Sequence, residues 1–358
     1  MANPITPTPH PRPSLLSTTK AKGESRIKGQ GSSGALGGSG DFRGVVHDLP
    51  MRGRVSRGIE GLIVIVLMAV GASLLIGGPT LSGRAPNASA TVRPAGPIPD
   101  FGHIYLLILE NKGLDQILTT TKAPYLASLI GRYGLATNYD AVWQKSQPNY
   151  LALFSGSTHD ITDDQAHDLA GPDLADQIDA SGRSWSVFAE NVPGGCFAGL
   201  TSSGGPDGQG TYARKHEPAI SFTDISRNPG RCARIMDFTH FDPTAADFEM
   251  IVPNLCDDMH DCSIADGDAF LARFVPRILS SPAWQSGGVL FITFDEGLGS
   301  GTHPDRVATL VISSRVPAGF RSTVYHTHYS LLRTVEAAWD LGCLDRSCRA
   351  NDLSEFFP

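Results

Sequence analysis

This 358-residue chain has no excess of positive charge: 29 lysines and arginines stand against 36 acidic residues, a net charge of −7. A basic nucleic-acid-binding protein is therefore excluded. Cysteine is missing from the first half, since all six cysteines follow residue 190. No internal repeat is visible. The composition, with 41% hydrophobic and 18% charged residues, fits a globular protein and excludes a fibrous or wholly disordered one.

Residues 1–58 contain few apolar side chains and many Pro, Ser, Gly and Thr residues. Such a composition cannot bury enough apolar surface to offset the loss of chain entropy, which predicts a disordered segment. Charge is also divided unevenly: residues 1–60 hold nine basic and four acidic side chains, and the remainder holds 20 basic and 32 acidic ones. This asymmetry suggests that the two parts occupy different compartments.

One long apolar run follows, because residues 61–83 carry no charge. The run is long enough to cross about 30 Å of hydrocarbon. Arg52, Arg54 and Arg57 precede it, which predicts a cytoplasmic N-terminus and an exported remainder. We expect a transmembrane anchor over 59–80.

A cleaved signal is the alternative to an anchor. Translation from Met51 would give a short basic leader, and Ala88-Ser89-Ala90 offers a small-residue cleavage site. Residues 81–100 are rich in Pro, Ala and Ser and are predicted to be a linker. The folded domain is predicted to span 101–358.

The even number of cysteines in a segment predicted to be exported indicates disulfides. Pairing by proximity in the sequence predicts Cys256–Cys262 and Cys343–Cys348, and leaves Cys196–Cys232. Their spacing fits no usual zinc site.

Continuous apolar runs at 103–109, 288–294 and 307–312, with a weaker one at 184–189, are typical of strands buried on both faces. Helical patterns lie at 124–132, 149–155, 266–279 and 328–340. This alternation predicts an α/β fold with a mostly parallel central sheet flanked by helices. Residues 191–230, rich in Gly and Pro, are expected to form a long loop over the site.

Acidic side chains follow two of the predicted strands. Glu110-Asn111 comes after the first, and Asp295-Glu296 after the second. Ligands bind at the carboxyl ends of strands in such sheets. Clustered carboxylates repel one another unless a cation lies among them, so these residues predict a divalent metal site of unassigned identity, with Ca, Mg, Mn and Zn all open.

Ser146 precedes Pro148, a residue that suits the first position of a helix. A serine at a helix N-terminus faces free N–H groups suited to a phosphate, and a hydroxyl beside a metal can act as a nucleophile. Asn149 is a candidate donor to phosphoryl oxygens. Asp258 and His260 lie between two cysteines in a segment dense in ligand-type side chains, and form a further candidate pair.

Six ordered motifs together resemble the bacterial phosphoesterase family of secreted acid phosphatases and phospholipases C, within the alkaline-phosphatase-like superfamily. The motifs are Glu110-Asn111-Lys112 with Asp115, the segment Ser146–Gly156, Lys215-His216-Glu217-Pro218, the segment Pro253–Asp261, Phe294-Asp295-Glu296-Gly297 and the segment His328–Glu336.

The resemblance implies an alkaline-phosphatase-like fold and a set of residue roles. Glu110, Asn111, Asp295 and Glu296 would hold a metal together with the Ser146 hydroxyl. Asn149 would contact the phosphoryl group, and the surrounding residues would supply charge or protons. Those residues are Asp258, His260, His216 and His328. Members often have histidine directly before the 307–312 strand, where this chain has Arg306, with His303 three residues earlier.

The function expected from this resemblance is that of an exported, acid phosphatase-like phosphomonoesterase that acts through a phosphoseryl intermediate. A phospholipase C-type phosphodiesterase is the alternative within enzymes. A membrane-tethered metal- or phosphate-binding module without turnover is the alternative of another class.

Overall fold

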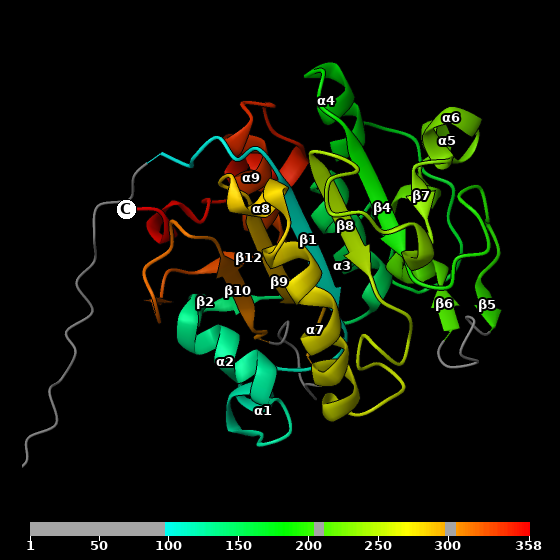
Figure 1. The fold of residues 1–358 in the computed structure, drawn as a ribbon. Helices are drawn as coiled ribbons and strands as arrows, with labels where there is room; N and C mark the ends of the chain where they lie inside the picture. Colours follow the sequence, from blue (N-terminus) through cyan, green and yellow to red (C-terminus); the bar gives the residue numbers. More distant parts are fainter. Residues whose placement is uncertain (1–96, 204–210, 298–305) are drawn as a thin grey trace, which may run out of the picture. The chain divides into compact units, whose positions relative to one another are not determined.

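The computed structural model describes residues 97–203, 211–297 and 306–358. A central eight-stranded sheet has the order β11-β2-β10-β9-β1-β8-β4-β7. Each of the four predicted runs forms a buried strand, which confirms the predicted α/β class (Figure 1). These strands are β1 (Ile104–Leu109), β4 (Trp185–Ala189), β9 (Val289–Phe294) and β10 (Thr309–Ile312).

The sequence reasoning missed β8 (Phe248–Val252), which lies between β1 and β4 at the centre of the sheet. Glu249 interrupts its apolar run, yet this side chain is completely buried. The outer strands β2 (Gly134–Ala136), β7 (Ile235–Met236) and β11 (Arg321–Ser322) are too short to give a periodic signal.

Most neighbouring strands are parallel, as predicted. β1 pairs in parallel with both β8 and β9, and β4 pairs in parallel with β8 and β7. The exception is β10, which runs antiparallel to both β9 and β2. Strand direction depends on the path of the connecting segments, and an apolar run does not encode it.

Four helices form close to their predicted ranges: α2 (Pro124–Arg132), α3 (Ser146–Ser155), α7 (Ile264–Leu279) and α9 (His328–Ala338). In Figure 1, α2 and α7 lie on one face of the sheet and α3 and α9 on the other. All ten residues of α3 are buried, because this helix has no polar face and neighbouring elements cover it on all sides.

The remaining described elements are short. They are α1 (Leu114–Thr119), α4 (Leu174–Ala180), α5 (Thr223–Ser226), α6 (Pro229–Cys232), α8 (Pro282–Gln285), β3 (Tyr139–Asp140), β5 (Thr201–Ser203), β6 (Thr211–Ala213), β12 (His326–Thr327) and the 3-10 helices η1 (Arg214–His216), η2 (Ala219–Ser221), η3 (Phe238–His240), η4 (Asp345–Arg349) and η5 (Ser354–Phe356).

The expectation of one long loop over 191–230 is wrong. The described residues of this stretch form β5, β6, η1, η2, α5 and α6 in succession. Elements of three or four residues are too short to leave a periodic pattern, and the glycines and prolines between them mark turns rather than a single loop.

All six cysteines form disulfides, paired as predicted: Cys196–Cys232, Cys256–Cys262 and Cys343–Cys348. The predicted disordered tail, the anchor or signal segment and most of the predicted linker lie outside the described residues. Within the described ranges, no helix combines the length and apolar character that a membrane crossing requires.

Candidate active site

The site is built first by β1 and β9, which run parallel and in step, with Leu109 opposite Phe294. Their next residues, Glu110 and Asp295, therefore leave the sheet side by side. The backbone N–H of Asn111 donates to Asp295 Oδ1 at 3.0 Å. The predicted convergence of acidic residues at the carboxyl ends of these two strands is confirmed.

Ser146 reaches the same place from the first turn of α3. Its side chain is 1% exposed, and its Oγ donates to Glu110 Oε2 at 3.1 Å. The helix begins two residues before Pro148, which occupies the third helical position rather than the predicted first one. A proline at this position removes no helical hydrogen bond, because the N–H groups of the first turn have no intrahelical partner.

Asn149 does not face the site. Its Oδ1 accepts the N–H groups of Val142 and Trp143, and its Nδ2 donates to the carbonyls of Trp143 and Lys145. Every polar atom of this amide is thus bonded to backbone. Asn149 therefore stabilises the turn over residues 142–145 that precedes Ser146, rather than making the predicted phosphoryl contact.

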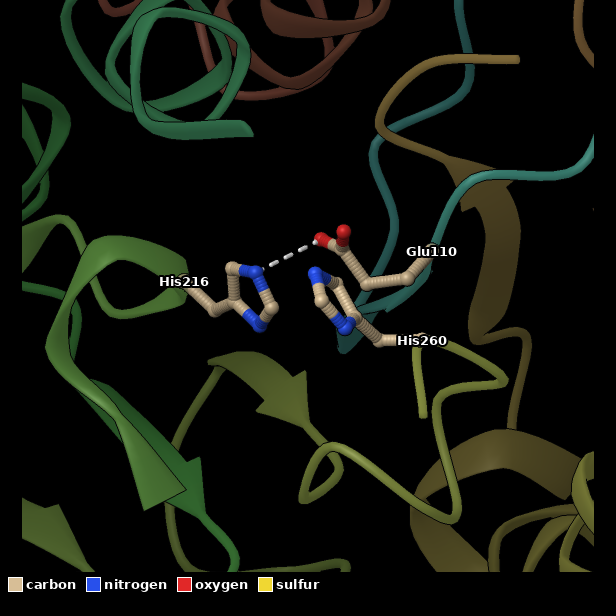
Figure 2. Close-up of side chains that lie close together, drawn as sticks. All are labelled: Glu110, His216 and His260. Atoms are coloured by element: carbon tan, nitrogen blue, oxygen red, sulfur yellow. Dashed lines mark ion pairs between the residues drawn. The ribbon is translucent and has the colours of Figure 1, made fainter. Parts of the chain in front are cut away.

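His216 lies between two buried carboxylates, and Figure 2 shows its ion pair with one of them, Glu110. Its Nε2 is 3.2 Å from Glu110 Oε1, and its Nδ1 is 3.3 Å from Asp258 Oδ2. Tyr150, one turn after Ser146, donates to Glu110 Oε1 at 2.8 Å and stacks on the imidazole. Burial, together with the nearby charge of Lys215, lowers the pKa of His216 well below its usual value, so this ring is neutral at pH 7.

The segment between Cys256 and Cys262 brings Asp258 and His260 to the site. Asp258 Oδ1 accepts the backbone N–H of His260 at 2.7 Å, which fixes both residues in one tight turn. The buried Lys112 donates to the carbonyl of Met259 at 2.8 Å and ties this turn to the end of β1. The predicted Asp258–His260 pair therefore lies beside Glu110.

His328 is buried behind the site. Its Nε2 is 2.6 Å from the carbonyl oxygen of Asp295, and its Nδ1 is 3.0 Å from the Tyr139 hydroxyl. Burial lowers the pKa of His328 to about 4, so the ring is neutral. The prediction that His328 supplies charge or protons to a phosphoryl group is corrected: both ring nitrogens are occupied, and the ring supports the strand end that carries Asp295.

The environment of the site disfavours the ionised form of its carboxyl groups and raises their pKa values. Burial, followed by repulsion from Asp295 and Asp258, raises the pKa of Glu110 well above its usual value. Burial is also the main cause that raises the pKa of Asp295 to about 6 and that of Glu296 to about 8. Asp295 Oδ2 finds no hydrogen-bond donor among the described residues. A cation among these oxygens would relieve the repulsion between the carboxylates and would be coordinated by the unpaired Asp295 Oδ2.

Two sets of residues could hold a cation. The predicted set, Glu110, Asn111, Asp295 and Glu296, surrounds the paired strand ends. In the second set, His216 and His260 were not predicted as ligands: one atom each of Glu110, His216 and His260 lie within 4.8 Å of one another. Figure 2 shows these three side chains turned toward a common point. Glu110 belongs to both sets.

Lys215 was quoted in the sequence only as part of a motif, and the structure places it in the site. Its Nζ is 3.4 Å from Ser146 Oγ, 3.3 Å from His260 Nε2 and 3.6 Å from Asp164 Oδ2. It comes from η1, far from Ser146 in the sequence. Its position directly before His216 is the only signal that the sequence offered.

Arg306 lies in an isolated bridge beside β3, where its Nε is 3.3 Å from Asp140 Oδ1 and its side chain is half exposed. His303 lies outside the described residues. A phosphate contact by either residue stays a prediction.

Comparison with known proteins gives a family for this arrangement. The model of the phosphoesterase family matches residues 110–342. An acid phosphatase of Aspergillus fumigatus is 27% identical over 75% of this chain and 62% of its own length. A phosphatidylinositol-3-phosphatase of Mycobacterium tuberculosis is 29% identical over 69% of this chain and 80% of its own.

Among solved structures, a protein in the alkaline phosphatase superfamily from Vibrio parahaemolyticus is 12% identical, with a TM-score of 0.46 over 74% of each chain. The match to the acid phosphatase of Aspergillus fumigatus covers less than two thirds of that enzyme's length. The family match, in contrast, includes both strand ends, Ser146, Lys215 and the turn of Asp258 and His260. The chain belongs to the phosphoesterase family.

Proposed function

We propose that this protein hydrolyses phosphoric esters, as an acid phosphatase-like monoesterase with Ser146 as its nucleophile. The observation that carries the proposal is the environment of Ser146 Oγ, which lies 3.1 Å from Glu110 Oε2 and 3.4 Å from Lys215 Nζ at the start of a helix. The names of the relatives, an acid phosphatase and a phosphatidylinositol-3-phosphatase, support monoesters over diesters.

A divalent metal fits this site. Glu110, Asp258 and Asp295 are all completely buried, and such a group of carboxylates is unstable without a compensating cation. Glu110, Asn111, Asp295 and Glu296 would hold the ion next to the Ser146 hydroxyl. When bound, the metal would polarise the phosphoryl group and favour the ionised form of the serine.

The residues of the chain would carry the reaction as follows. Ser146 Oγ, ionised after its hydroxyl proton has left to solvent, attacks phosphorus and forms a phosphoserine, while the bond from phosphorus to the alcohol oxygen breaks. His260, which is partly exposed and unlike His216 can reach solvent, gives a proton to the departing alkoxide. Water then attacks the phosphoserine and gives a proton back to His260, while the bond from phosphorus to Ser146 Oγ breaks, which releases phosphate and restores the ionised serine. The Lys215 ammonium balances the negative charge on Ser146 Oγ and on the phosphoryl oxygens throughout.

The helix N-terminus contributes to the same charge balance. Ser146 is the first residue of α3, and the N–H groups of a helix's first turn attract phosphate oxygens. The N–H of Gln147 already donates to Asp164 Oδ1 at 3.1 Å, so this group orients the acid that also contacts Lys215. The first turn thus positions the cationic side chain as well as the nucleophile.

The test uses the full-length protein with p-nitrophenyl phosphate and its diester, with and without a chelator. We expect turnover of the monoester, loss of turnover with chelator, and a loss of about 10³-fold or more in Ser146→Ala. Ser155→Ala, on the same buried helix with its Oγ bonded to Leu151 O, is the matched control and retains activity.

Four outcomes separate the alternatives. Wild-type rates in Ser146→Ala would refute the nucleophile, and full activity in chelator would refute the metal. Preferred turnover of the diester would identify the phospholipase C-type activity. Metal binding with no turnover of either ester would identify the binding module.

We also propose that the domain acts outside the cytoplasm, behind the tail 1–58 and the segment 59–80. Three disulfides in the described residues support an oxidising compartment. Whether residues 61–83 remain as an anchor or are removed after export is tested by the mass of the mature protein in membrane and soluble fractions.

A further inference from the structure

A cleft with a volume of about 230 Å³ lies next to the site, between the turn before β5, the end of β6 and the segment after β8. Its apolar wall includes Leu200, Ala213 and Leu255, and its polar end includes Asp164 and Lys215. Apart from Lys215 and Asp164, the proposed reaction uses none of the residues that line this cleft.

The polar end connects the cleft to the nucleophile. Lys215 lines the cleft, and its Nζ reaches to 3.4 Å from Ser146 Oγ. Asp164 also lines the cleft, and its Oδ1 accepts the N–H of Gln147, the residue that follows the serine. A group attached to a phosphoryl centre at Ser146 would therefore find this cleft directly beside it.

The walls of the cleft select against charge. Leu200 leaves 53% of its surface exposed, one of five large apolar side chains so exposed in the described residues. Arg214, although it lines the cleft, donates to the carbonyls of Ala198 and His167 and is 5% exposed, so it is not free for an anion. The carboxylate of Asp164 would repel a second anionic group. Apolar contact with Leu200 would be favourable, at about 25 cal/mol for each Å² covered.

The size of the cleft limits the occupant. Sites for drug-sized ligands measure about 300 to 1,000 Å³. A volume of about 230 Å³ fits one ring or a short alkyl chain.

We propose that this cleft binds the organic group of the phosphate ester and that it prefers an uncharged apolar group, such as a single aromatic ring. The inference rests on the proposed function, because the occupant is the substrate's own alcohol. It goes beyond it by naming the substrate class and Leu200 as a residue that determines specificity.

The experiment compares phenyl phosphate with glycerol phosphate in the full-length protein. For each variant, the ratio of kcat/KM for the two substrates is divided by the wild-type ratio, which cancels the difference in leaving-group chemistry. Leu200→Ser is expected to lower kcat/KM for phenyl phosphate by about 5- to 10-fold and to leave glycerol phosphate within about twofold. Leu118→Ser is the matched control, since this leucine on α1 is 47% exposed and does not line the cleft.

A binding measurement keeps the inference separate from turnover. Phenylphosphonate cannot be hydrolysed, and NMR saturation transfer from the protein to its ring protons is expected in wild type and in Leu118→Ser, and to fall in Leu200→Ser. An unchanged ratio of kcat/KM together with unchanged saturation transfer would overturn the subsite. Saturation transfer that is retained in wild type and falls in Leu200→Ser, in a protein that hydrolyses no ester, would overturn only the proposed reaction.

Discussion

Replacing Lys215 by methionine is the sharpest test of how the site handles negative charge. Methionine keeps the length and most of the apolar volume of lysine but removes the ammonium, which lies 3.4 Å from Ser146 Oγ. The variant removes no ligand of the predicted metal set. Its effect therefore reports on the cation that the chain itself supplies.

The magnitude follows from the geometry. Two unit charges 3.4 Å apart interact by about 5 kcal/mol at an effective dielectric constant of about 20. Lys215 is 21% exposed, and Ser146 acquires only part of a full charge in the transition state, so both factors reduce this value. We expect a loss of about 2 to 3 kcal/mol in transition-state stabilisation, or about 30- to 150-fold in kcat/KM.

The assay is the steady-state hydrolysis of p-nitrophenyl phosphate by wild type, Lys215→Met and Lys215→Arg. Lys215→Arg keeps the charge and is expected to retain more activity than Lys215→Met. Thermal unfolding of each variant checks that the fold is intact, since Lys215 also contacts Asp164. If a folded Lys215→Met stays within about threefold of wild type, the assignment of charge stabilisation to Lys215 is wrong.

Two further predictions concern stability. Burial raises the pKa of Glu249 from 4.5 to about 8, so the folded state holds this proton more tightly than the unfolded state and stability falls as pH rises through that window. Urea unfolding should show that Glu249→Gln gains about 4 kcal/mol over wild type at pH 8 relative to pH 4, since each pKa unit corresponds to about 1.4 kcal/mol. An equal difference at both pH values would refute this. Gly156 ends α3 with φ +73°, and a Cβ there would lie 2.1 Å from the Leu344 carbonyl oxygen. Gly156→Ala should lower the free energy of unfolding by about 2 to 4 kcal/mol, whereas Gly131→Ala, with open space around it, should not.

The central strands show where sequence reasoning succeeds. β1 and β9 are uninterrupted apolar runs followed at once by acidic residues, so both the strands and the edge at which Glu110 and Asp295 meet could be predicted. β8 escaped prediction because the buried Glu249 breaks its run, and burial of a carboxyl depends on neighbours that a single segment does not reveal.

The roles of individual side chains were less predictable than their presence. Asn149 and His328 both lie in motifs of the family, yet their polar atoms are bonded within the protein. Lys215 is the opposite case: no role was predicted for it from the sequence, yet its ammonium group lies beside the proposed nucleophile. Residue type and motif membership do not report which way a side chain is turned.

The sequence by itself determined the strands that end in acidic residues, the serine at the start of α3 and the disulfides Cys256–Cys262 and Cys343–Cys348, because each of these depends on residues near one another along the chain. The third disulfide, Cys196–Cys232, followed as the pair that remained. Only the tertiary structure decided that Lys215 reaches Ser146, that His216 joins Glu110 to Asp258, and that an apolar cleft opens beside them. These contacts join segments separated by tens of residues. Their geometry follows from the packing of the whole sheet and its helices, which no local pattern specifies.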